Sequence, residues 1–256
     1  MQTITDFISK KNQSWFKEWF DTYFYQQLYS NRNEQEAENF VDNLINKLTP
    51  PEDSIMLDLG CGAGRHAKSL AAHGYQVTGV DLSPSSIRLA KKVHTPGAQF
   101  YQHDMRLPFC VSRYHYIFSF FTSFGYFKTQ EENEAVMQNI VMALKPKGTI
   151  VLDYLNVNYS EDRITEKEMK EIDGIYYDIT RWHDETHFYK HIAVNDSIEG
   201  GEIHEYREQV EKIRLYEFDI LFKKHGLKLK QVYGDYDLNS YNANTSPSLI
   251  MIAEKI

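Results

Sequence analysis

The sequence predicts an α/β fold with a mostly parallel, doubly wound β-sheet. Between residues 51 and 156, short apolar segments alternate with amphipathic ones, and a glycine-rich turn follows the first apolar segment. Strands that alternate with helices at this spacing form parallel sheets, which bind ligands at the carboxyl ends of their strands. A change of pattern after residue 156, toward alternating and β-forming residues, indicates an antiparallel β insert before the last helix.

The first fifty residues are predicted to form a helical segment. Their apolar residues recur at helical spacing, and Pro50 and Pro51 close the segment before the first strand. We interpret its aromatic stripe mainly as packing. Tyr25 and Tyr29, in the stretch YQQLY, are four residues apart and therefore share a helix face.

Residues 54–83 predict a strand, a glycine-rich turn, a helix and a second strand that ends in Asp81. Gly60, Gly62 and Gly64 alternate in the turn, where glycine lets the backbone bend sharply and approach a ligand. The helix that follows directs its free N–H groups toward that turn. A carboxylate about twenty residues beyond the first glycine is placed to bind the two hydroxyls of a ribose. This stretch therefore predicts a nucleoside-binding site.

The later segments complete the predicted order of elements. After a helix that begins at Ser83 and Pro84, we expect strands at residues 98–104, 114–121 and 149–155, with a helix at 130–144. Residues 172–215 are expected to form the antiparallel insert, with turns at DETH (184–187) and EGGE (199–202), before a helix at 217–225 and two last strands at 227–233 and 249–253. The expected domains are a helical segment or lid (1–50), a ligand-binding domain (51–156 and 215–256) and a β insert (157–214).

Composition narrows the class of protein. The chain has 256 residues, with 42% hydrophobic and 25% charged residues, as in ordinary soluble globular proteins. A formal net charge of −8 argues against a nucleic-acid partner. Cys61 lies inside the glycine turn and Cys110 has no C-x-x-C partner, so we expect reduced thiols.

The expected location is the cytoplasm, because we find neither a signal-peptide pattern nor an apolar run long enough to span a membrane. We expect no metal site. His183, His187 and His191 are spaced by four, but they fall in the predicted strands and turn rather than on a helix face.

The glycine turn has the form D-x-G-x-G-x-G, and this pattern resembles motif I of the class I S-adenosylmethionine (SAM)-dependent methyltransferases. It runs from Asp58 through Gly64, with Arg65 where a dinucleotide-binding turn carries its third glycine. The order of elements resembles the seven-stranded fold of that family, whose final strand is antiparallel. A bacterial, small-molecule-type group with a β insert is similar in several patterns: YQQLY, LDLGCGAGRHA, GYQVTGVDLS, FFTSFGYF, LKPKGTIVLDYLN, VYGDYD and SPSLIMIAEK. Members often carry arginine after the last Ser-Pro, where this chain has Ser248.

The resemblance implies SAM as cofactor and S-adenosylhomocysteine (SAH) as product. The cofactor-binding residues that it implies are Tyr25, Asp58, Gly60, Cys61, Gly62, Gly64, Asp81, Leu82, His103, Asp104, Met105, Phe120 and Phe121. Gly60, Cys61 and Gly62 would lie under the methionine part, and Tyr25 would close over its carboxylate.

The same resemblance assigns the nucleoside end. Asp81 would hold the ribose, with Leu82 beside the adenine. Asp104 would accept a hydrogen bond from the adenine amino group while the Met105 backbone reads the ring edge. His103, which precedes that acid, is interpreted as a residue that positions the backbone.

Phe120 and Phe121, at the end of the fourth strand, would flank the sulfonium, since aromatic faces attract cations. Tyr126, in the loop TSFGYF, is the candidate catalytic residue. It would position an acceptor or pass its proton, although a free phenol with a pKa of about 10 is a poor base at neutral pH.

The sequence therefore predicts a SAM-dependent methyltransferase that transfers a methyl group by in-line displacement to a nitrogen or oxygen of a small-molecule acceptor. The alternatives are an NAD-type oxidoreductase, which Arg65 disfavours, a protein or RNA methyltransferase, and a non-catalytic SAM-binding protein. The β insert is expected over the acceptor site, where it would shape substrate choice or form a homodimer contact.

Overall fold

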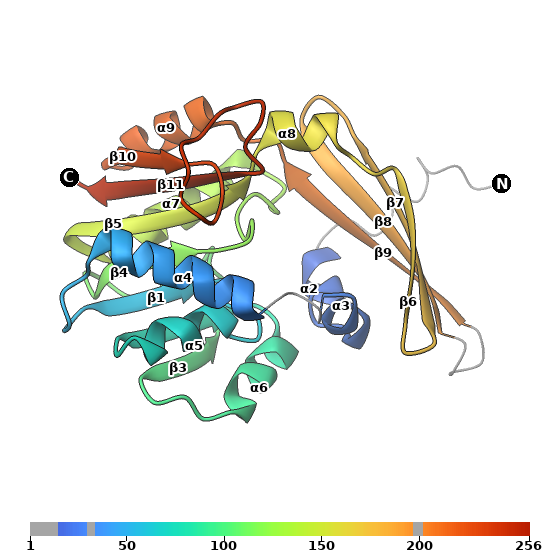
Figure 1. Cartoon of the computed structure of the whole chain (residues 1–256), viewed down its shortest axis with the longest axis horizontal. Coiled ribbons are helices and arrows are strands. Elements are labelled where there is room, and N and C mark those ends of the chain that lie inside the picture. The colour runs from blue at the N-terminus through green and yellow to red at the C-terminus, as the bar shows by residue number, and fades with distance from the viewer. Residues whose placement is uncertain (1–14, 30–33, 197–201) are drawn as a thin grey trace. The chain divides into compact units, whose positions relative to one another are not determined.

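The computed structural model describes residues 15–29, 34–196 and 202–256, and the chain divides into two compact units (Figure 1). The larger unit holds residues 34–163 and 212–256. The smaller holds residues 15–29, 164–196 and 202–211. The segment expected as one piece over residues 1–50 is thus shared between the units. Most of the EGGE turn expected at 199–202 lies outside the described residues.

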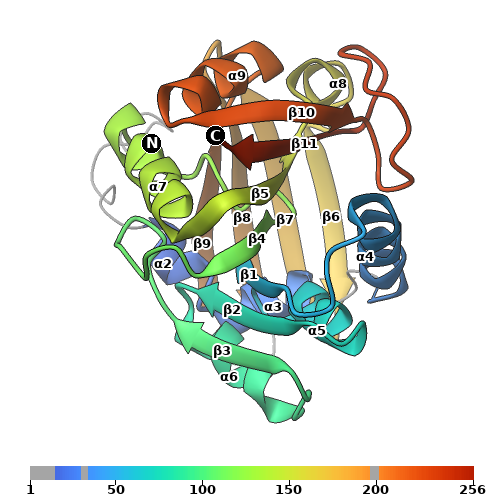
Figure 2. The same ribbon diagram turned by 90° about the vertical axis from the view of Figure 1, so that its left-hand side faces the viewer.

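The larger unit is built on a seven-stranded sheet in the order β10-β11-β5-β4-β1-β2-β3, which Figure 2 shows. The central pairings are parallel, whereas β11 runs antiparallel to both of its neighbours. The predicted mostly parallel sheet with an antiparallel last strand is therefore confirmed. The strands are β1 (Ile55–Leu59), β2 (Gln76–Asp81), β3 (Ala98–Gln102), β4 (Tyr114–Ser119), β5 (Leu144–Leu155), β10 (Leu227–Tyr233) and β11 (Ser248–Lys255).

Helices cover this sheet on both faces (Figure 2). On one face α4 (Glu34–Leu48), α5 (Arg65–Ala72) and α6 (Pro84–Lys92) share a buried apolar core with the strands. The other face carries α7 (Gln130–Ala143) and α9 (Leu215–Lys224), and the short helix α8 (Val157–Asp162) follows β5. The predicted start of α6 is confirmed, because the Ser83 hydroxyl accepts from the Ser86 amide at 3.1 Å and Pro84 is the first helical residue.

The smaller unit is a four-stranded antiparallel sheet in the order β6-β7-β8-β9, which confirms the predicted antiparallel insert. Its strands are β6 (Lys167–Ile172), β7 (Ile175–His183), β8 (His187–Asp196) and β9 (Glu202–Glu211). Two short helices, α2 (Trp15–Trp19) and α3 (Tyr23–Leu28), pack on it through a cluster that includes Trp19, Tyr177 and Ile192. Within the insert expected at 157–214, the antiparallel pattern was expected from residue 172, but the first strand is β6, whose charged sequence KEMKEI suits an exposed edge strand.

Candidate functional site

The site lies at the carboxyl ends of five adjacent strands of the larger unit. These strands, in the order β5-β4-β1-β2-β3, each bring a residue of interest to the same edge of the sheet. The turn after β1 is fixed by the neighbouring strand, since the amides of Gly60 and Cys61 both donate to the Val80 carbonyl, at 2.9 and 3.0 Å. A Cβ atom added to Gly60 would lie 2.6 Å from the Cβ of Ser123, so the turn packs only with glycine there.

Gly62 and Gly64 have different roles in the turn, although both have positive φ, +54° and +85°. At Gly64 an added Cβ would lie 2.6 Å from the Phe100 ring, so this glycine is required for packing. At Gly62, apart from its chain neighbours, no heavy atom of the described residues lies within 4 Å of that position. The backbone at Gly62 is therefore an open cradle that a side chain would fill.

Asp81 joins this cradle to the helix that follows β2. Its Oδ2 accepts from the Gly62 amide and its Oδ1 from the Ser83 amide, both at 2.8 Å. A carboxylate accepts hydrogen bonds through both of its oxygens and is therefore the type of group that binds the hydroxyls of a ribose. The residues present therefore fit the ribose that the sequence assigned to Asp81.

Asp58 lies beneath the same turn and is buried. Burial, followed by the charge of Asp81, raises the pKa of its carboxyl to about 7, while the Ala67 amide and Arg65 act in the opposite direction. Among the described residues its Oδ2 has no hydrogen-bond partner. A buried acceptor left in this state is destabilising until it receives a donor. The carboxylate therefore favours a cationic or hydrogen-bond-donating ligand above it.

Cys61 offers only its backbone to a ligand at this turn. Its thiol is buried in the apolar core, and burial raises its pKa well above the usual value. A Cβ added to Gly79 would lie 3.0 Å from the Cys61 sulfur, which shows how closely the thiol packs on β2.

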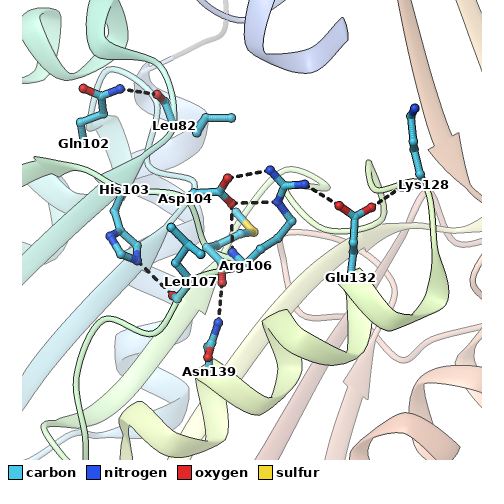
Figure 3. Close-up of polar contacts among 10 residues, drawn as sticks. Leu82, Gln102, His103, Asp104, Arg106, Leu107, Lys128, Glu132 and Asn139 are labelled. Atoms are coloured by element: carbon cyan, nitrogen blue, oxygen red, sulfur yellow. Dashed lines mark hydrogen bonds and ion pairs between the residues drawn. The ribbon is translucent and has the colours of Figure 1, made fainter. Parts of the chain in front are cut away.

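Asp104, after β3, is bound by Arg106 through three hydrogen bonds (Figure 3). The Arg106 amide and Nε donate to Oδ1 at 3.1 and 3.0 Å, and Nη2 donates to Oδ2 at 2.7 Å. Arg106 also donates from Nη1 to Glu132 of α7, at 2.5 Å. Both carboxylate oxygens of Asp104 are thus held by Arg106, and its expected contact with the adenine amino group stays a prediction.

Side chains fix the backbone around this acid (Figure 3). Asn139 donates to the Met105 carbonyl at 3.1 Å, and Gln102 donates to the Leu82 carbonyl at 3.2 Å. His103 lies 3.1 Å through its Nε2 from the Leu107 carbonyl oxygen. Its ring therefore contacts the loop backbone, and the positioning role expected for it stays a prediction.

The end of β4 places two consecutive non-glycine residues in the left-handed region, Phe121 at φ +58° and Thr122 at φ +54°. Asp153 of β5 holds both, since its carboxylate accepts from the Phe121 amide at 2.8 Å and its carbonyl from the Thr122 amide at 3.1 Å. Such strained backbone persists only where neighbouring bonds enforce it. The Arg65 guanidinium carbon lies 4.7 Å from the centre of the Phe121 ring.

Asp153 is buried and was not among the predicted site residues. Burial raises the pKa of its carboxyl to about 7, although bonds from Phe121 and Tyr236 act in the opposite direction. The Tyr236 hydroxyl donates to its Oδ2 at 3.1 Å. The only sequence signal was an acid in an otherwise apolar strand, TIVLDYL.

Phe120 lies in the core rather than at the surface of the site. Its ring is 2% exposed and stacks on His66, with ring centres 4.2 Å apart, and on Phe118, at 5.4 Å. Phe120, which the sequence analysis placed beside the sulfonium, therefore packs in the core next to the helix that follows the turn.

Comparisons with known proteins agree with this geometry. A family model described as a methyltransferase domain matches residues 56–148, from β1 into β5. Residues 56–148 therefore belong to a methyltransferase domain.

Similar proteins include two N,N-dimethyltransferases named for dTDP-linked amino sugars. The dTDP-3-amino-3,4,6-trideoxy-alpha-D-glucopyranose N,N-dimethyltransferase of Streptomyces venezuelae is 33% identical over 118 residues, which are 46% of this chain and 48% of that protein. The chain thus spans about half the length of the curated relatives it matches.

Two solved structures show the fold over most of the chain. A SAM-dependent methyltransferase from Clostridium acetobutylicum ATCC 824 is similar with a TM-score of 0.75 at 13% identity, covering 90% of this chain and 95% of that one. SAM-bound CalS10, an amino pentose methyltransferase from Micromonospora echinaspora, has a TM-score of 0.65 at 20% identity and covers 92% and 98%. The match to a methyltransferase domain supports SAM as the cofactor.

In the methyltransferase domain, Tyr126 lies on an anchored loop. Its neighbours Phe124 and Phe127 are buried, whereas Tyr126 is half-buried. Gly125 has φ +84°, and a Cβ added there would lie 2.3 Å from the Tyr154 hydroxyl, so the loop packs tightly on β5. The catalytic role of Tyr126 stays a prediction.

Tyr25 belongs to the smaller unit, outside the methyltransferase domain. Its ring centre lies 5.6 Å from that of Trp19, 5.0 Å from Phe20 and 4.8 Å from Tyr29. The expectation that it closes over the cofactor stays a prediction. Within the described ranges, we find neither a cluster of three or more His, Cys, Asp or Glu arranged to hold a metal ion nor a helix long and apolar enough to cross a membrane.

Proposed function

We propose that this protein binds SAM on the turn after β1 and transfers the methyl group by in-line displacement to a nitrogen or oxygen of a small-molecule acceptor. One observation carries the proposal: the open backbone at Gly62 donates a hydrogen bond to Asp81, a carboxylate at the end of the second strand, which is where nucleoside-binding folds place the acid that binds the ribose hydroxyls. Gly74 and Gly226 have equally open surroundings, so the hydrogen bond to the Asp81 carboxylate is what distinguishes Gly62.

Bound SAM supplies a methyl group that is already activated by its sulfonium. The residues of the chain then have to bind the cofactor and the acceptor, align the two, and exclude water from the site. Asp58 and Asp153 are two buried carboxylates at the ends of β1 and β5, and they favour positive charge in the site. Asp153 also fixes the Phe121 turn, and such alignment contributes much of the catalysis in a displacement of this kind.

A base is required only when the acceptor is protonated, as an ammonium or a hydroxyl is. Tyr126 is the proposed residue that positions the acceptor, because it is half-buried whereas Phe124 and Phe127 of the same loop are buried. The names of the relatives support an amine of a sugar-like molecule as the first acceptor class to test. A hydroxyl group is the second.

We propose that the antiparallel sheet of the smaller unit shapes acceptor choice or forms a homodimer contact. Trp182 and Tyr189 stack across β7 and β8, with ring centres 5.4 Å apart, and Arg207 lies over the Tyr189 ring. Sedimentation of the purified protein tests the dimer. A cytoplasmic setting is proposed because Cys61 and Cys110 are both free thiols in the structure.

The decisive experiment is calorimetric titration of the purified protein with SAH, with NAD as the control. Micromolar binding of SAH and none of NAD is expected, after which labelled SAM is used to screen amines, hydroxy acids and sugars. Binding of NAD alone would assign the oxidoreductase alternative. Binding of SAH without methylation of any small molecule, peptide or RNA would favour a non-catalytic SAM-binding protein.

A further inference from the structure

Two residues outside the predicted site, Arg106 and Glu132, connect its two ends. Arg106 binds Asp104, the acid assigned to adenine, and extends Nη1 to the Glu132 Oε1 atom (Figure 3). The other carboxylate oxygen of Glu132, Oε2, accepts from the Lys128 backbone amide at 2.9 Å. The chain of contacts thus runs from the end of β3 to the loop that leaves β4.

Packing reinforces the same connection. The Arg106 guanidinium carbon lies 5.5 Å from the centre of the Phe127 ring, and Phe127 is buried. Phe127 and Lys128 directly follow Tyr126 in sequence. A shift of Arg106 would therefore affect two parts of the loop that carries Tyr126: the Lys128 backbone, through Glu132, and the buried Phe127 side chain, by direct contact.

These ion pairs are partly open to solvent. The side chains of Arg106, Asp104 and Glu132 are 22%, 15% and 30% exposed. Pairs in that state contribute little, because water screens them. A flat apolar group placed against Asp104 excludes water, and the same charges then attract each other more strongly.

We infer that Arg106 and Glu132 are positioning residues that couple the adenine end of the cofactor site to the loop at residues 122–128. The inference rests on the proposed function, since it takes Asp104 as the adenine contact. Adenine bound there shields the Asp104–Arg106 pair, Arg106 then holds Glu132 more firmly, and Glu132 holds the Lys128 amide. Coupling of this kind is reciprocal, so a loop ordered by the acceptor raises the affinity for the cofactor by the same factor.

Hydrogen exchange at the Lys128 amide, with and without saturating SAH, measures this coupling. We expect SAH to slow exchange there by about tenfold in the wild-type chain, which corresponds to about 1.4 kcal/mol. In Glu132→Gln the gain should vanish while SAH still binds. Arg106→Lys should also lose the SAH-dependent slowing of exchange, because an ammonium cannot bridge two carboxylates as the planar guanidinium does.

Two controls separate coupling from a merely structural role. Glu134 lies on the same helix and pairs with Lys224 at 2.5 Å, so Glu134→Gln removes a comparable charge away from the loop. Thr129→Ala removes the hydroxyl that accepts from the Glu132 amide at 3.3 Å and contacts the Glu131 side chain, and so weakens the helix cap without touching the Glu132 carboxylate. Both variants should keep the SAH-dependent gain in protection.

The outcomes are distinct. A full gain in Glu132→Gln and in Arg106→Lys would overturn the coupling while leaving the proposed function intact. An equal loss of the gain in Thr129→Ala would overturn it too, because capping alone would then explain the result. If wild-type protein did not bind SAH, the proposed function would fail, and this inference with it.

Discussion

Gly62→Ala distinguishes a binding defect from a folding defect at the turn after β1. Gly62 has φ +54°, in the left-handed region where an L-residue costs roughly 1–2 kcal/mol. Apart from chain neighbours, no described heavy atom lies within 4 Å of the added Cβ, so steric overlap adds nothing within the protein. We expect the free energy of unfolding to fall by about 1 kcal/mol and Tm by roughly 2–4 °C.

The effect on ligand binding should be larger, because the new methyl group enters the space proposed for SAM. Overpacking by one methyl group typically costs about 1–3 kcal/mol, and each 1.4 kcal/mol is tenfold in affinity. The affinity for SAH should therefore fall by roughly 5- to 150-fold. Urea unfolding and calorimetric titration of the same preparation give both numbers.

Two other glycines supply matched controls. Gly74, just after α5, has φ +92° and equally open surroundings, so Gly74→Ala should lose similar stability and keep its affinity for SAH. Gly64→Ala, which drives a Cβ to 2.6 Å from Phe100, should lose more stability than either. Wild-type affinity in Gly62→Ala would refute the reasoning, since the open cradle would then hold no ligand.

Three further predictions concern carboxylates. Asp81→Ala should weaken SAH binding by about 3 kcal/mol, because the charge-assisted bonds to the ribose and the bond to the Gly62 amide are lost together. Unchanged affinity in calorimetric titration would show that Asp81 does not contact the ligand. Asp153 has a folded-state pKa of about 7 against an ordinary 3.8, so its ionisation opposes folding as pH rises between these values. Asp153→Asn should therefore gain stability relative to wild type between pH 4 and pH 8, by up to about 4 kcal/mol, and a flat difference in urea unfolding would contradict this. In the smaller unit, Glu208→Ala removes the carboxylate that lies 2.7 Å from the Lys190 ammonium; these side chains are 12% and 19% exposed, so the loss should cost about 3–5 kcal/mol in unfolding experiments. In the larger unit, Asp219→Ala breaks a pair with Lys223, which is 70% exposed, and should cost under about 1 kcal/mol.

The order of elements in the larger unit was predictable because its signals are local. A glycine turn, a Ser-Pro helix start and short apolar strands act over a few residues, and the predicted strand at residues 227–233 matches β10 in full. Prediction failed where local composition was misleading. Strand β6 is exposed and charged, and β5 begins at Leu144, five residues before the expected start, where a helix was expected to end.

What the sequence alone determined is therefore the class of site: a glycine turn with acids in register at the ends of successive strands. Only the tertiary structure decided which of those acids are already engaged and which lie beneath the site. Arg106 donates hydrogen bonds to the Asp104 carboxylate. Asp153 accepts a hydrogen bond from the Phe121 amide, although the two residues are 32 positions apart in the sequence. The physical reason is that burial, charge and hydrogen-bond capacity depend on neighbours in space, and parallel strands bring together residues that the chain keeps far apart.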